Sequence, residues 1–181
     1  ARYCRFDLLR AVCSLASMVT RWTPECDRRL DRLMQYVRKT INRSLYGYCG
    51  DDPENVTPHL FADADLGGCT KTSKSTSGSF LGLKGPRTSF PLAAQSRKQG
   101  CVSTSTPEAE IVSLFHGLKN YGIPCIAMWE KLFDRDVKLV VCEDNTTCIS
   151  VCRTGRNPTM RPLPRVHRLS LIHISEPTRL R

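Results

Sequence analysis

Two aspartates stand one residue apart in the stretch FADADLGG at positions 61–68. Side chains of an extended strand alternate between two faces, so Asp63 and Asp65 are expected on one face and the alanines on the other. Two like charges this close cost free energy unless water, a proton or a cation lies between them. The pair therefore indicates either a solvated strand edge or part of a metal site.

Two further carboxylates could complete such a site. Glu110 falls in the first turn of a predicted helix at the edge of its apolar stripe, and Asp144 ends a buried-type strand. If the strands that carry Asp63 and Asp144 are neighbours, the three acids converge and need cations. Hard oxygen ligands select Mg²⁺ or Mn²⁺, and two ions about 4 Å apart support phosphodiester hydrolysis. The alternative stays open that Glu110 and Asp144 only cap helices.

The elements that must position these acids follow residue 57 in the order β-β-β-α-β-α. Strands are predicted at about 76–83, 88–95 and 136–144. Between the last two strands, Ser105 and Glu108 have the spacing of a capping box at the start of a helix. A meander followed by an α/β crossover predicts an α/β fold with an α+β-like mixed sheet and helices packed on it.

A helical hairpin is predicted before this domain. Apolar residues recur at helical spacing from residue 8, and a second helix follows Thr23 and Pro24, which suit an N-cap and a first turn. The hairpin covers 7–43, and the turn formers at 47–58 mark a boundary.

Composition narrows the class of protein. A chain of 181 residues with 40% hydrophobic content can bury a core, and it has no apolar run long enough to cross a bilayer. The ten cysteines include no CxxC pair, which favours reduced intracellular thiols without disulfide partners. A net charge of +10, concentrated at the two ends of the chain, makes nucleic acid the first partner to consider.

Several runs resemble one known family. FADADLGG, KSTSGSFLGL, STSTPEAEIVSL and VVCEDNTTCI, in this order, resemble the ribonuclease H domain of copia-type retrotransposon polyproteins. The N-terminal run up to RKT resembles the end of the reverse transcriptase. The resemblance implies a C-terminal or connection segment of the reverse transcriptase at 1–48 and a ribonuclease H-like domain at 57–169, incomplete at its C-terminus.

The resemblance also implies roles for residues. Asp63, Glu110 and Asp144 would be catalytic acids that bind two Mg²⁺ or Mn²⁺ ions, with Asp65 outside the ligand set. The implied reaction is hydrolysis of the RNA strand of an RNA–DNA hybrid during reverse transcription, in a cytoplasmic particle or the nucleus. The implied partners are the hybrid and the reverse transcriptase portion of the same polyprotein. Substrate contacts are expected from Asn145, Ser75, Arg153, Arg156 and Arg161, and further basic candidates are Arg97, Lys98 and Arg165.

The end of the chain departs from the family pattern. SLIHISEPTRLR at 170–181 resembles translated sequencing-adapter sequence, so we expect a non-native tail there. The family places a fourth carboxylate beyond a further strand, and we expect the chain to end before both, which predicts weak or absent nuclease activity. One alternative is a catalytically inactive nucleic-acid-binding or connection fragment. An integrase-type nuclease is disfavoured, because it would need two aspartates before its glutamate.

Overall fold

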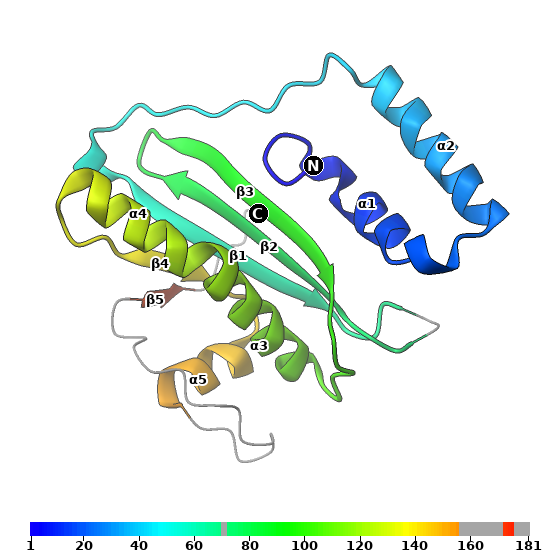
Figure 1. Ribbon diagram of the computed structural model, residues 1–181. Coiled ribbons are helices and arrows are strands. Elements are labelled where there is room, and N and C mark those ends of the chain that lie inside the picture. Colours follow the sequence, from blue (N-terminus) through cyan, green and yellow to red (C-terminus); the bar gives the residue numbers. More distant parts are fainter. Residues whose placement is uncertain (70–71, 156–171, 176–181) are drawn as a thin grey trace, which may run out of the picture.

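Figure 1 shows the computed structural model, which describes residues 1–69, 72–155 and 172–175. At its centre lies a five-stranded sheet with the strand order β3-β2-β1-β4-β5. The strands are β1 (Thr57–Asp65), β2 (Thr76–Lys84), β3 (Ser89–Lys98), β4 (Leu139–Cys142) and β5 (Ile172–Ser175). The first three form an antiparallel meander, whereas β4 runs parallel to both β1 and β5. The predicted mixed sheet is therefore confirmed.

The central strand β1 shows the expected alternation. Leu60, Ala62 and Ala64 are buried, whereas Asp63 between them is exposed. Small residues on the buried face let a helix approach the sheet closely. The two faces of β1 thus separate core packing from the acidic side chains.

One continuous helical run covers the buried face of the sheet. It consists of α3 (Thr106–Gly117), a single π-helical turn η4 (Leu118–Gly122) and α4 (Ile123–Phe133), and it runs along the strands of the meander in Figure 1. Leu114 and Leu118 from this run join Leu60 and Leu139 of the sheet in the core. The helix α5 (Thr146–Thr154) lies beside α3 and adds Ile149 to the same core.

The start of α3 follows the predicted capping pattern. Ser105 is the N-cap, and its hydroxyl accepts a hydrogen bond of 3.4 Å from the Glu108 amide. Pro107 lies in the first turn, where its missing N–H costs nothing. The Glu108 carboxylate accepts from the Thr104 amide at 2.8 Å. These local contacts fix where the helix that carries Glu110 begins.

The N-terminal hairpin lies beside β3, at the opposite edge of the sheet from β5 (Figure 1). Its helices are α1 (Leu9–Ala16) and α2 (Pro24–Lys39), with a 3₁₀ turn η2 at Val19–Arg21 between them and another, η1, at Phe6–Leu8 before them. The predicted first helix is therefore shorter than its apolar periodicity indicates. The ring of Phe6 packs edge-on against Phe80 at 5.7 Å between centroids and holds the hairpin to the sheet.

Two features of the C-terminal part differ from the sequence analysis. The fourth strand is only Leu139–Cys142, so Asp144 follows the strand instead of ending it. A fifth strand is also present within the segment expected to be a non-native tail, because Ile172–Ser175 pairs with β4 in parallel. The expectation that the chain ends before a further strand was wrong. The alternating sequence IHIS suits a strand, and pairing satisfies the backbone groups at the open edge of β4.

Candidate carboxylate metal site

Three carboxylates meet at one end of the sheet. Asp63 lies near the end of β1, and Asp144 follows β4, which pairs with β1 in parallel up to Phe61 and Cys142. Parallel neighbours end at the same edge of a sheet, so both aspartates emerge there. Glu110 reaches this edge from α3, and one ligand oxygen from each of Asp63, Glu110 and Asp144 lies within 4.8 Å of the other two. We call these three residues the carboxylate cluster.

The members of the carboxylate cluster differ in burial. Asp63 and Asp144 are exposed, whereas Glu110 keeps only 4% of its surface accessible. Burial, followed by the charges of Glu143, Asp63 and Asp144, raises the pKa of Glu110 to about 8. One of its oxygens, Oε2, is buried without a hydrogen-bond partner in the described residues. The cluster thus has one buried ligand and an open side formed by two aspartates.

Glu143 is a fourth acidic residue close to the cluster that sequence reasoning missed. It is 1% exposed; its Oε1 accepts a hydrogen bond of 3.2 Å from the Asn145 amide, and its Oε2 finds no partner among the described residues. Burial is the main reason that its pKa rises to about 7. A signal was available, because Glu143 stands two residues after the buried Val141 in an extended run.

Asp65 does not belong to the carboxylate cluster. Its Oδ1 accepts a hydrogen bond of 2.9 Å from the Thr76 amide, and its Oδ2 lies 3.4 Å from the Arg10 guanidinium. Asp65 therefore ties the end of β1 to the beginning of β2 and to α1. The two aspartates of FADADLGG thus have different partners. Asp63 belongs to the carboxylate cluster, whereas Asp65 bonds to neighbouring elements of the fold.

The proposed substrate contacts are distributed over several environments. Asn145 is the N-cap of α5, where its Oδ1 accepts from the Cys148 amide at 2.9 Å. Ser75 is fully buried and accepts from the Gly67 amide at 3.1 Å. Arg153 is exposed in the last turn of α5. Arg156 and Arg161 lie outside the described residues.

The donor set of the carboxylate cluster fits a hard divalent cation. Carboxylate oxygens are the ligands that Mg²⁺ and Mn²⁺ prefer, and a cation would neutralise the repulsion that raises the pKa of Glu110. The orphaned Oε2 of Glu110 offers a lone pair that no protein donor takes in the described part of the chain. The exposed side of Asp63 and Asp144 leaves coordination positions for water or phosphate.

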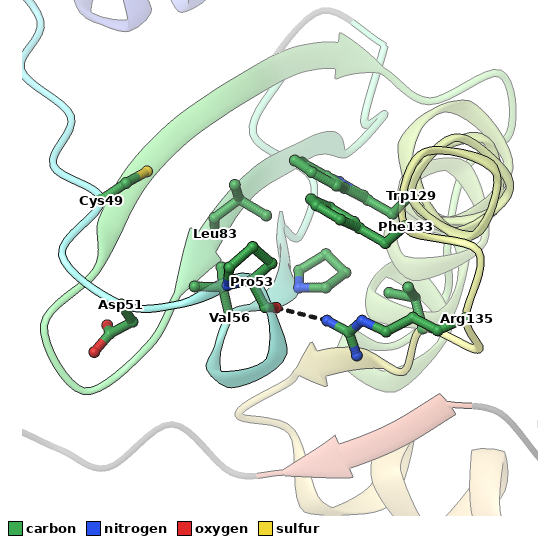
Figure 2. A pocket seen from close by; sticks show the side chains of 10 residues that line it. Cys49, Asp51, Pro53, Val56, Leu83, Trp129, Phe133 and Arg135 are labelled. Atoms are coloured by element: carbon green, nitrogen blue, oxygen red, sulfur yellow. Dashed lines mark hydrogen bonds between the residues drawn. The ribbon is translucent and has the colours of Figure 1, made fainter.

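An apolar cavity lies near the start of β1, away from the carboxylate cluster. Figure 2 shows its walls, with the parallel rings of Trp129 and Phe133 facing Leu83, Val56 and Pro53. The cavity has a volume of about 140 Å³. Among the described residues that line it, Asp51 is the only acid, and its Oδ2 accepts a hydrogen bond of 2.7 Å from the Arg87 amide. This apolar cavity therefore offers no acid–base or metal chemistry comparable with that of the cluster.

The cysteines and helices add two findings. Cysteines in the described residues are thiols and form no disulfide bonds. Of the helices that the structure describes, none combines the length and the apolar character needed to span a membrane.

Comparison with known proteins gives distant likenesses. The sequence matches no protein-family model and no curated protein. Aligned solved structures include LC11-RNase H1 in complex with an RNA/DNA hybrid, at 12% identity and a TM-score of 0.45, over 68% of this chain and 86% of that chain. Native prototype foamy virus protease-reverse transcriptase aligns at 13% and 0.41, over 74% of this chain but only 19% of that one. A foamy viral protease-reverse transcriptase with dsDNA aligns at 14% and 0.38, over 73% and 88%.

Proposed function

We propose that this chain is a ribonuclease H-type, metal-dependent endonuclease that hydrolyses the RNA strand of RNA–DNA hybrids. The observation that carries the proposal is the meeting of Asp63, Glu110 and Asp144, with ligand oxygens within 4.8 Å of one another. The three acids come from separate elements, so their convergence is a property of the fold. The motifs around them resemble those of copia-type retrotransposon polyproteins. We propose that the chain belongs to such a polyprotein and acts inside the cell beside its reverse transcriptase portion.

The chain's own residues have distinct tasks in this proposal. Bound divalent ions, two in the implied mechanism, would activate water and stabilise the leaving 3′-oxygen. Glu110 supplies the buried ligand, and its environment favours the ionised form only when positive charge arrives. Asp63 and Asp144 hold the open side, where a phosphodiester can approach. The cluster thus orients a phosphate without contacting a base, so little base specificity is expected.

Positive charge beside α3 supports binding of a polyanion. Burial, and after it the nearby charges of Arg97 of β3 and Lys119 of η4, lower the pKa of His116. Arg97 and Lys119 thus place two positive charges close to His116, which lies on the helix that carries Glu110. Phosphate groups of a nucleic acid are attracted to such charges whatever their sequence. We propose that Arg97 and Lys119 contact the backbone of the hybrid.

Cleavage of an end-labelled RNA–DNA hybrid by the full chain, across a Mg²⁺ titration, tests the function. Protein in excess over hybrid allows slow cleavage to be measured in a single turnover. Asp63→Asn, Glu110→Gln and Asp144→Asn should each lower the cleavage rate by about 100-fold or more, because outer partners of metal ligands alone account for about 10- to 100-fold. Asp136→Asn is the matched control, since this exposed aspartate precedes β4 at its other end.

The same experiment separates the enzyme from the alternative function. Hybrid binding without Mg²⁺-dependent cleavage, unchanged by Asp63→Asn, would identify a nucleic-acid-binding or connection fragment. Cleavage that Asp136→Asn reduces as strongly as Asp63→Asn would also count against the proposal, because the effect would then not belong to the carboxylate cluster.

A further inference from the structure

A buried hydroxyl joins the helix that carries Glu110 to the strand that carries Asp63. Ser113 lies one turn after Glu110 on α3 and is fully buried. Its Oγ donates toward two backbone carbonyl oxygens, that of Asp63 at 2.8 Å and that of Gly78 at 3.1 Å. Asp63 and Gly78 face each other across β1 and β2, so a single side chain reaches both strands.

The same helix also brings Glu110 close to the next residue of β1. The Ala64 amide lies near enough to the Glu110 carboxylate to lower its pKa, against the larger opposite effect of burial. This amide is accessible to Glu110 because β4 pairs with β1 only as far as Phe61. The peptide group between Asp63 and Ala64 is therefore bound to α3 through its carbonyl by Ser113, and its N–H lies close to Glu110. The Asp63 side chain projects from this segment.

Helix formation alone does not call for serine at this position. Alanine has a higher helix propensity, and a buried hydroxyl is costly unless it is hydrogen-bonded. The helix α3 also lies close to the sheet at Gly117, because a Cβ added there would lie only 3.1 Å from the Ser79 Oγ. Contacts other than that of Ser113 therefore already bring the helix to the sheet. The distinctive property of Ser113 is that its bond ends on the backbone of Asp63 itself.

We propose that Ser113 is a positioning residue that fixes the separation of the Asp63 and Glu110 carboxylates and thereby the cluster's affinity for a divalent cation. The presence of a cation in this inference rests on the proposed function. The contact between Ser113 and the two strands does not, because it is given by the hydrogen bonds. Groups that orient metal ligands typically change metal affinity by about 10- to 100-fold.

Mn²⁺ binding to the full chain, measured from the paramagnetic resonance signal of the free ion, tests the inference without an activity assay. Ser113→Ala should weaken binding by about tenfold. Ser79→Ala is the matched control, because it removes a buried hydroxyl from the same face of β2 that α3 covers. It should bind Mn²⁺ as the unchanged chain does. If Ser113→Ala does not fold, Ser113→Cys, of similar size but a weaker donor, should show weakening in the same direction.

Two results would overturn the inference: unchanged Mn²⁺ affinity in Ser113→Ala, or equal weakening in Ser79→Ala. If the unchanged chain itself binds no Mn²⁺, the proposed function fails, and amide hydrogen exchange of the metal-free chain decides the role of Ser113. Faster exchange at the Ala64 amide, by about three- to tenfold, in Ser113→Ala but not in Ser79→Ala would support positioning. Equal exchange in both variants would refute it.

Discussion

At the scale of single residues, the cluster combines one buried acid with two exposed ones. Glu110 of α3 is buried, while Asp63 and Asp144 are exposed to solvent. Burial, and after it the charges of the neighbouring acids, raise the pKa of Glu110 to about 8. A proton occupies this position at neutral pH in the metal-free chain, and a divalent cation must displace it.

This proton predicts how stability depends on pH. The pKa of Glu110 is about 8 in the folded chain against an ordinary value of 4.5, so the folded chain binds the proton more tightly. The stabilisation is complete below pH 4.5 and is lost as the pH rises through 8. The melting temperature of the metal-free chain should therefore fall between pH 5 and 8, and Glu110→Gln should flatten that fall.

Thermal unfolding followed by circular dichroism at several pH values measures the effect. Glu54→Gln, which changes an exposed glutamate in the turn before β1, is the control and should keep the slope. Addition of Mn²⁺ should raise the melting temperature most at the highest pH, where fewer protons compete. A slope that Glu110→Gln leaves unchanged would show that this residue is not the titrating group.

The sequence allowed part of the site to be predicted. Asp63 and Asp65 were expected on one face, and the structure gives them different partners. No local pattern revealed that Ser113 would bond to the backbone of Asp63, because that contact joins residues 50 positions apart. Glu143 was overlooked because an acid after a strand is ordinarily exposed, whereas here it is buried and accepts a hydrogen bond from the Asn145 amide.

At the scale of elements, the helix α5 fixes the backbone just after Asp144. Its N-cap is Asn145, whose side chain accepts from the Cys148 amide at 2.9 Å. Asp144 was considered as a possible cap for this helix, but the next residue fills that place. Asp144 is thereby left available to the carboxylate cluster.

Loss of the Asn145 cap should lower the stability of the folded chain measurably. Asn145→Ala removes the acceptor and should lower the free energy of unfolding by about 1 kcal/mol. Asn145→Ser keeps an acceptor and should restore most of it. Urea denaturation of the three chains measures the difference. If alanine and serine were equally stable, the hydrogen bond to Cys148 would not contribute to stability.

The strands show where sequence patterns lose precision. The apolar run at 136–144 predicted a long strand, but β4 pairs only over Leu139–Cys142. Hydropathy reports burial, whereas a strand is defined by its partners, and Val137 is buried without strand pairing. The capping pattern at Ser105 predicted the start of α3 more accurately than hydropathy predicted the bounds of β4, because capping depends on residues that are close in sequence.

At the scale of the whole molecule, the charge distribution is the dominant property. The net charge is +10, while the acids of the cluster gather at one end of the sheet. A basic surface attracts a polyanion, and the cluster repels it unless cations intervene. Binding of the nucleic acid and binding of divalent ions should therefore depend on each other.

This balance predicts a strong effect of salt on nucleic-acid binding. Affinity for an RNA–DNA hybrid should fall steeply between 50 and 200 mM salt, by about tenfold or more, because counterions return to the phosphates. Fluorescence anisotropy with a labelled hybrid measures it. Arg97→Ala should reduce the slope of log affinity against log salt, whereas Asp136→Asn should not. An affinity independent of salt would exclude a backbone-directed interface.

The wide turn at Leu118–Gly122 has a consequence for how the chain tolerates insertions and deletions. Its hydrogen bonds span one residue more than those of the helices on either side, so it sets the rotation of α4 relative to α3. Losing one residue there would rotate everything downstream by about 100° and shift it by about 1.5 Å. Trp129 and Phe133 would then swing off their wall of the apolar cavity while Glu110 stayed in place. The length of this turn therefore determines which face α4 presents to the sheet, independently of how α3 is placed.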